Sequence, residues 1–130
     1  MAVAYGFGKT VAYGFDEALA RVTEALKAEG FGVLTEIDVK ETLRKKLDRE
    51  FARYRILGAC NPPFAFQALT AEPEIGMLLP CNVVVREDSE GCTRVEFMDP
   101  LAVLKLVNRP EVEAIAKQVR ERLDRVAASL

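Results

Sequence analysis

The stretch CNVVVREDSEGCTRVEFM, residues 81–98, decides the fold of this 130-residue chain. Its two halves carry the β-branched and aromatic residues that strands favour, and the letters DSEG between them form a turn. In the second half, Val95 and Phe97 are predicted to face the core, and Arg94 and Glu96 to face solvent. An antiparallel β-hairpin is therefore expected over this stretch.

Bulky and small residues also alternate at the N-terminus, and this period of two predicts another extended strand. Bulky residues occupy alternate positions, namely Val3, Tyr5, Phe7, Val11, Tyr13 and Phe15. Small residues fall between them, namely Ala4, Gly6, Gly8, Ala12 and Gly14. The bulky face belongs in the core, and the small face would allow close approach by another backbone, as from a partner chain.

Two long helices are predicted, one near each end of the chain. Asp16 opens the first, and Gly30 ends it in the left-handed position that glycine favours. Pro110 starts the second. Its apolar residues repeat at helical spacing along one face: Val112, Ile115, Val119, Leu123 and Val126.

Two further strands, over residues 31–37 and 51–59, are predicted between the first helix and the hairpin. Asp38 and Glu41 have the spacing of a capping box, which indicates a short polar helix through Leu47.

Asn61 before Pro62 predicts an accepting N-cap and a helix over residues 62–72. Asp99 is similarly expected to cap a turn over residues 101–107. These two segments are the small helical insertions near the hairpin.

The order strand, helix, four strands, helix predicts a single α+β domain over residues 1–130. Its sheet should be largely antiparallel, with both long helices packed on one face. No repeat and no Gly-, Ser- or Pro-rich linker divides the chain. A domain of this length buries about two thirds of the surface of its unfolded chain, so it needs no disulfide or metal merely to fold.

Composition excludes several classes of function. With 18 Lys and Arg against 20 Asp and Glu, the net charge of −2 offers no overall field for nucleic acid or an anionic membrane. The basic cluster of Lys40, Arg44, Lys45 and Lys46 is interleaved with acidic residues, as on a solvated helix face. There is no histidine, which removes histidine bases, Ser-His-Asp and Cys-His dyads, and imidazole metal sites.

The N-terminal residues show no signal-peptide pattern, and no apolar run has the length of a membrane span. Three cysteines, an odd and sparse set, are typical of a reducing compartment. A cytoplasmic protein is therefore expected.

The dipeptide Cys-Asn occurs twice, as Cys60-Asn61 and Cys81-Asn82, each time beside a proline. If the third and fourth strands are antiparallel neighbours, the chain leaves and re-enters the sheet at one edge, and the two sulfurs could approach. Such a pair could exchange a disulfide or hold a soft metal such as Cu(I). Catalytic or metal-ligating roles for Cys60 and Cys81 are therefore the first hypothesis. No particular cofactor follows from it.

Cys60 would be the exposed thiolate, because it directly precedes a helix N-terminus. The helix dipole contributes about 0.3–1 kcal/mol, which lowers a thiol pKa by less than about one unit. A cationic neighbour would also be needed, and Arg53 and Arg55 lie on the same strand. Cys92 is expected to face solvent near the hairpin turn and is left out of the site.

Two alternatives stay open beside the thiol hypothesis. In the plainer one, the cysteines are small buried residues that pack at strand ends. In the other, the protein is a homodimeric binding module without catalysis. Its pocket near Asn61, Pro62, Leu79 and Pro80 receives a small molecule or a peptide. The candidate binding residues are Asn61, Pro62, Pro80, Asn82 and Asp99, with Leu79 beside them.

Five segments are specific when taken together: Lys9-Thr10-Val11, Gly30-Phe31-Gly32-Val33-Leu34, Gly58-Ala59-Cys60-Asn61-Pro62, Leu79-Pro80-Cys81-Asn82-Val83-Val84-Val85 and Asp99-Pro100. They resemble the bacterial and archaeal domain-of-unknown-function family 302. The resemblance covers nearly the whole chain. It implies a strand-helix-four-strand-helix fold and a dimer, and it implies no established reaction, substrate or catalytic residue.

Overall fold

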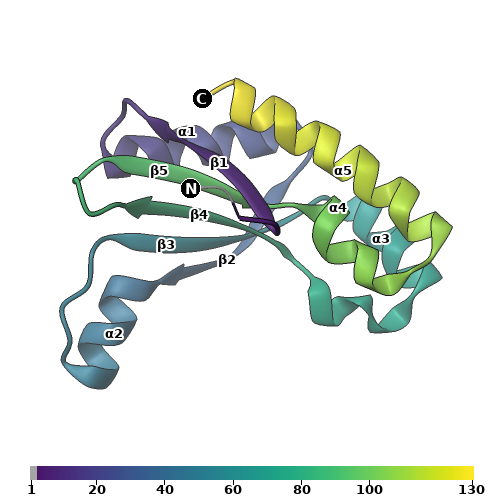
Figure 1. The fold of residues 1–130 in the computed structure, drawn as a ribbon, viewed down its shortest axis with the longest axis horizontal. Helices are drawn as coiled ribbons and strands as arrows, with labels where there is room; N and C mark the ends of the chain where they lie inside the picture. Colours follow the sequence, from purple (N-terminus) through teal and green to yellow (C-terminus); the bar gives the residue numbers. More distant parts are fainter. Residues whose placement is uncertain (1–2) are drawn as a thin grey trace.

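An antiparallel sheet of five strands, in the order β1-β5-β4-β3-β2, forms the centre of the computed structural model, which describes residues 3–130 (Figure 1). The strands are β1 (Gly6–Val11), β2 (Gly32–Asp38), β3 (Tyr54–Cys60), β4 (Cys81–Glu87) and β5 (Thr93–Met98). The helices are α1 (Phe15–Ala28), α2 (Val39–Leu47), α3 (Pro62–Ala71), α4 (Pro100–Val103) and α5 (Pro110–Ala128), with 3₁₀ turns η1 (Pro73–Leu78) and η2 (Leu104–Val107). The predicted α+β fold is confirmed.

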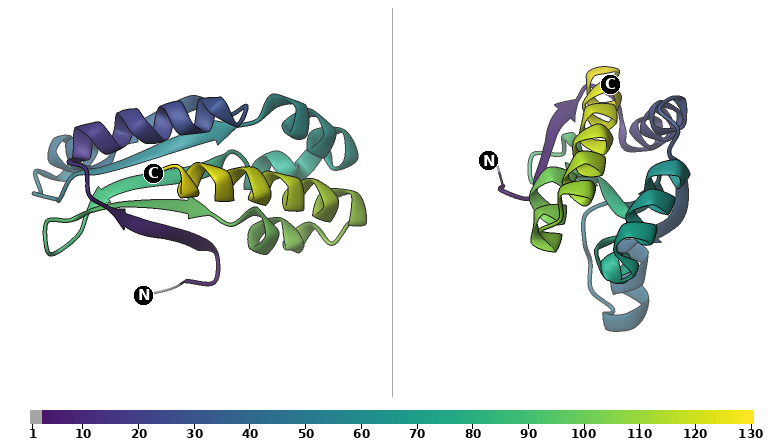
Figure 2. Two further views of the ribbon diagram at one scale, coloured as in Figure 1. Left: turned by 90° about the horizontal axis from the view of Figure 1, so that it is seen from above. Right: turned by 90° about the vertical axis from the view of Figure 1, so that its right-hand side faces the viewer.

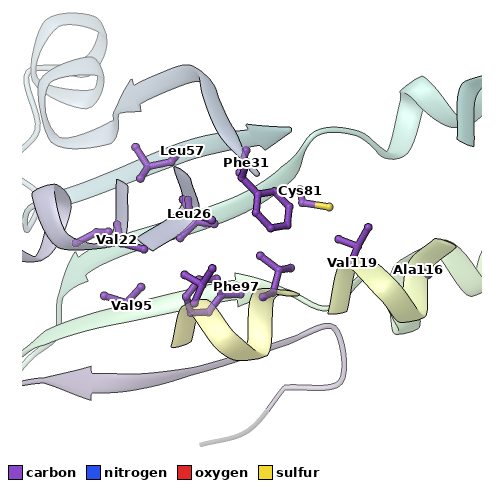
Figure 3. Packing of buried hydrophobic residues seen from close by; sticks show 14 of the residues in the cluster. Val22, Leu26, Phe31, Leu57, Cys81, Val95, Phe97, Ala116 and Val119 are labelled. Atoms are coloured by element: carbon purple, nitrogen blue, oxygen red, sulfur yellow. The ribbon is translucent and has the colours of Figure 1, made fainter. Parts of the chain in front are cut away.

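The long helices α1 and α5 cover one face of the sheet, as expected, whereas α2 projects on the opposite side (Figures 1 and 2). The core lies between the sheet and the two long helices, with Val22, Leu26, Leu57, Val95 and Phe97 among its buried side chains (Figure 3). All five residues of the predicted apolar face of α5 are buried.

The hairpin has the predicted orientation, with Val95 and Phe97 facing the core. Val83 of β4 lies opposite Phe97 of β5, and Val85 lies opposite Val95. All four are buried, because they share the face that α1 and α5 cover. The Asp88 carboxylate accepts hydrogen bonds from two backbone N–H groups of the turn.

Local signals also placed the helix ends correctly. Gly30 follows α1 with φ of +87°, and the Asp38 side chain accepts a hydrogen bond from the Glu41 N–H at 3.0 Å. The N-terminal alternation is longer than its strand, since β1 pairs with β5 only from Gly6 to Val11. Before the paired residues the prediction of a core face is wrong, because Val3 and Tyr5 are exposed. The Tyr5 carbonyl oxygen accepts a single hydrogen bond from the Asp99 N–H there.

The face of β1 that carries the small residues does allow another backbone to approach closely. The backbone that approaches it is β5 of the same chain. A Cβ atom on Gly8 would lie 2.4 Å from the Val95 carbonyl oxygen and 2.8 Å from the Glu96 Cα atom. The close approach of β5 therefore explains the glycines of β1, and a partner chain is not needed to explain them.

Within residues 3–130, no helix combines the length and the apolar character that crossing a membrane requires.

Candidate functional site

The end of β3 and the start of β4 lie at the same edge of the sheet, as the thiol hypothesis required. The two strands are antiparallel neighbours, and Ala59 lies opposite Cys81. Cys60 is one residue further along β3, where it pairs with Gly32 of β2. The two Cys-Asn segments are therefore neighbours in the fold.

The two sulfurs nevertheless do not form a paired site. Cys81 shares the core face with its partner Ala59, and both are buried. Figure 3 shows Cys81 beside Phe31 and Val119 of that core. Because side chains alternate along a strand, Cys60 is directed to the opposite face. The thiols are free and are not at disulfide or metal-site distance, so the expected convergence of the sulfurs is wrong.

The cations that were expected to activate Cys60 are engaged elsewhere. Arg55 pairs with Asp38 at 3.2 Å and also contacts Glu36 on the neighbouring strand. Arg53 lies 3.8 Å from the Asp16 carboxylate. In the described part of the chain, no group of three or more Cys, Asp or Glu side chains is placed to hold a metal ion.

Burial raises the pKa of the Cys81 thiol from its ordinary value of 9.0 to about 11, and nearby Cys60 adds to the rise. Removing the thiol from water disfavours its charged form. Cys81 is therefore a neutral thiol at physiological pH, which suits a core residue better than a nucleophile or a metal ligand.

This shift predicts a pH-dependent contribution of Cys81 to stability. Between pH 9 and 11 the unfolded chain loses the Cys81 proton while the folded chain keeps it, so the contribution falls as pH rises. From pH 8 to pH 10.5, the advantage of the wild type over Cys81→Ala in unfolding free energy should shrink by about 2 kcal/mol. Urea unfolding at the two pH values measures it.

The control is Cys92→Ala, because Cys92 is exposed. The difference in unfolding free energy between Cys92→Ala and the wild type should be the same at both pH values. If the difference for Cys81→Ala is equally constant, Cys81 titrates alike in the folded and unfolded chains.

Asn61 occupies the N-cap position of α3, but its side chain does not make the predicted cap bond. It instead donates through Nδ2 to the Glu29 carbonyl oxygen at 3.1 Å, which also accepts from Arg122 at 3.0 Å. Asn61 is buried and ties the start of α3 to the end of α1. Gly30 leaves room for it, since a Cβ there would lie 3.2 Å from Nδ2.

Asp99 has the predicted capping role and a further ion pair. Its Oδ1 accepts from the Leu101 N–H at 2.9 Å, and its Oδ2 lies 2.8 Å from the Arg120 guanidinium. Arg120 in turn lies 3.8 Å from the centre of the Phe7 ring. Asp99 therefore links β1, the turn after β5 and α5.

The remaining candidates lie at the start of α3 and at the start of β4. Pro62 is exposed in the first turn of α3, Pro80 directly precedes β4, and Asn82 is exposed on the sheet face away from α1 and α5. Two depressions lie elsewhere. One, of about 100 Å³, is lined by α2 and Phe51, and the other, of about 490 Å³, by α1 and Leu130.

An apolar surface formed by α3 and η1 was missed in the sequence. Among the ten residues of α3, none is charged and Ala68 alone is buried. Phe66 is 74% exposed, and Met77 in η1 is 80% exposed. Leu69, one turn from Phe66, is also exposed and contacts η1. We call Phe66, Leu69 and Met77 the α3–η1 surface.

A signal for this surface was present in the composition of the segment. Residues 58–85 contain only two charged residues, Glu72 and Glu74. A helix that is apolar on all sides is normally buried, so its exposure here was not apparent from the pattern.

The comparisons with known proteins agree with this fold. The family described as "Domain of unknown function DUF302" matches residues 7–130. The crystal structure of an uncharacterized conserved DUF302 protein from Bacillus stearothermophilus superposes with a TM-score of 0.90 at 31% identity, covering 98% of each chain. No curated protein matches the chain. The match over residues 7–130 and the shared architecture show that this chain belongs to the DUF302 family.

Proposed function

We propose that the protein is a non-catalytic, homodimeric binding module whose two copies meet through the α3–η1 surface. The observation that carries the proposal is the exposure of an uncharged helix. Large apolar side chains gathered on a surface usually mark an interaction site. Here they come from a helix and a turn that follow each other directly in the chain.

The site geometry favours binding over thiol chemistry. A redox or soft-metal function would need two sulfurs that meet, and Cys60 and Cys81 are directed to opposite faces. The neutral Cys81 thiol would be a poor nucleophile or ligand. The free cysteines support a reducing, cytoplasmic location, which is part of this proposal.

A second copy of the chain is the partner that the surface fits best. In a two-fold dimer the same patch meets itself, so a charged patch would place like charges together. The α3–η1 surface avoids this repulsion because its three residues are uncharged. Pro62 and Pro80 flank it at the start of α3 and after η1. We assign this region to a protein contact rather than to a small molecule, because Phe66, Leu69 and Met77 are exposed and line neither the depression at α2 nor the one at α1.

A stable interface buries about 800 Å² on each partner and involves roughly 20–30 residues a side. Phe66, Leu69 and Met77 would form its centre, and neighbouring exposed residues would complete it. Leu101 in α4 and Leu106 in η2 are also exposed. Helix α4 lies at the same end of the molecule as α3, so these residues could extend the contact (Figure 1).

The substitution Phe66→Glu tests the proposal. A charge at the centre of a two-fold contact would face its own copy, so the dimer should dissociate at least about 30-fold more readily, as for a hot-spot residue. Sedimentation equilibrium over micromolar concentrations measures the dissociation constant. Circular dichroism confirms that the variant is folded, which is expected because Phe66 is exposed.

The matched control is Gln118→Glu, which adds the same charge at an exposed position of α5. It should leave the dissociation constant unchanged. A wild-type protein that stays monomeric, or a Phe66→Glu dimer as tight as the wild type, would contradict the proposal.

A further inference from the structure

The face of the sheet opposite α1 and α5 has a row of apolar side chains across three strands. Val84 of β4 lies opposite Ile56 of β3, and Ile56 lies opposite Ile37 of β2. Val84 and Ile56 are half-buried, and Ile37 is 48% exposed. Neighbouring strands are about 4.8 Å apart, so the row is about 10 Å long. We call these three residues the apolar row.

Two arginines lie directly opposite each other at the β4 end of the apolar row. Arg86 of β4 is the register partner of Arg94 of β5. Like charges in directly opposed positions destabilise a sheet. Glu96, which is the register partner of Val84, offsets part of this repulsion by contacting both guanidinium groups. Asp88 also acts electrostatically on Arg86. The two guanidinium groups are therefore the cations that this part of the face offers to an anion.

The hydrogen bonds of the cluster leave donors free. Glu96 accepts from Nε of Arg86 at 2.7 Å, from Nη2 of Arg86 at 3.3 Å and from Nε of Arg94 at 3.3 Å. Nη1 of Arg94 donates to Thr10. Within residues 3–130, no acceptor bonds Nη1 of Arg86 or Nη2 of Arg94. Both side chains are partly exposed, so an anion can reach them.

We propose that this face binds an amphipathic monocarboxylate, with its carboxylate on Arg86 and Arg94 and its hydrocarbon chain along the apolar row. The free anion of a medium-chain fatty acid has this chemistry. Its carboxylate matches the geometry of guanidinium donors. Its chain would cover Val84, Ile56 and Ile37, which lie on the face away from α1 and α5.

A second copy of the chain fits this face poorly. A two-fold contact through the arginine cluster would bring Arg86 and Arg94 of one copy close to the same arginines of the other. The α3–η1 surface, by contrast, is uncharged and comes from other elements. The two proposals therefore concern separate surfaces and can fail separately.

Titration calorimetry with decanoate tests the inference. A ligand of this size on an open face should bind with a Kd of about 0.1–1 mM. The variant Arg94→Gln should bind about tenfold more weakly, because a charge-assisted bond is lost while the Arg86–Glu96 pair remains. The control Arg21→Gln removes an exposed arginine of α1 and should bind as the wild type does.

The position of the hydrocarbon chain is tested separately with Ile37→Ser. Ile37 lies at the far end of the apolar row, so this variant should weaken decanoate binding about three- to tenfold. Binding of butyrate, which is too short to reach across three strands, should be equally weak in the variant and in the wild type. Ile37 is about half exposed, so the fold should tolerate serine.

Three results would overturn the inference. They are the absence of decanoate binding at millimolar concentration, equal affinities of the wild type and Arg94→Gln, and binding of decanol as tight as that of decanoate. Phe66→Glu should leave decanoate affinity unchanged. A dimer that Phe66→Glu separates but that does not bind decanoate would remove this inference and leave the proposed function standing.

Discussion

Replacing Phe97 by alanine is expected to lower the free energy of unfolding by about 3–5 kcal/mol. Phe97 is 2% exposed and lies on β5, next to the centre of the sheet. Its ring stacks on that of Phe7 with 5.3 Å between centroids, and Val83 lies opposite it on β4. Truncation loses the transfer free energy of the ring and leaves a cavity. Urea unfolding followed by circular dichroism measures the loss.

Phe51→Ala makes the same change at a phenylalanine that is 46% exposed, in the segment after α2. It should cost less than about 1 kcal/mol, because less area returns to water. Equal losses for the two variants would contradict the place of Phe97 in the core between the sheet and helices α1 and α5.

The second large effect is expected from Gly8→Ala, at about 3 kcal/mol of destabilisation. The new Cβ would lie 2.4 Å from the Val95 carbonyl oxygen and 2.9 Å from the Glu96 Cγ atom. Backbone atoms of a paired strand cannot move aside without loss of ladder bonds, so β1 and β5 would have to separate. The change in urea midpoint at constant m-value gives the size of the effect.

Gly32→Ala is the matched control, since Gly32 is also a strand glycine. A Cβ there would meet nothing within 4 Å. The alanine should be neutral or stabilise by up to about 1 kcal/mol, because it reduces the entropy of the unfolded chain. A Gly8→Ala variant as stable as Gly32→Ala would contradict the close approach of β1 and β5.

The elements of the fold could be predicted because their signals are local. The alternation of β5, the capping pair Asp38 and Glu41, and the helical spacing of α5 each depend on residues a few positions apart. One face of each element is buried, and the period of its apolar residues reports that face directly. The predicted arrangement of two long helices on one side of an antiparallel sheet then followed from their order.

The candidate site could be predicted only in part. The chain does bring both Cys-Asn segments to one sheet edge, as the antiparallel order of β3 and β4 implies. The orientation of the sulfurs depends on register, because a shift of one residue moves a side chain to the other face. Ala59 lies opposite Cys81, and this places Cys60 on the face away from the core.

The hydrogen-bond partner of Asn61 could likewise not be predicted from the neighbouring residues. Its position before Pro62 predicted a local cap, whereas its partner is the Glu29 carbonyl, 32 positions earlier in the chain. The exposure of α3 is likewise a tertiary property. Its composition is that of a buried helix, and packing against α5 leaves Phe66 and Leu69 uncovered.

The amino-acid pattern alone thus determined the order of elements, the buried faces of the hairpin and of α5, and the exclusion of histidine chemistry. Only the tertiary structure decided which side chains meet: the separation of Cys60 from Cys81, the Asn61 bond to α1, and the pairing of Arg86 with Arg94. The physical reason is that helix and strand periods arise from neighbouring residues. Strand register and helix docking are instead determined by the free energy of the whole folded chain.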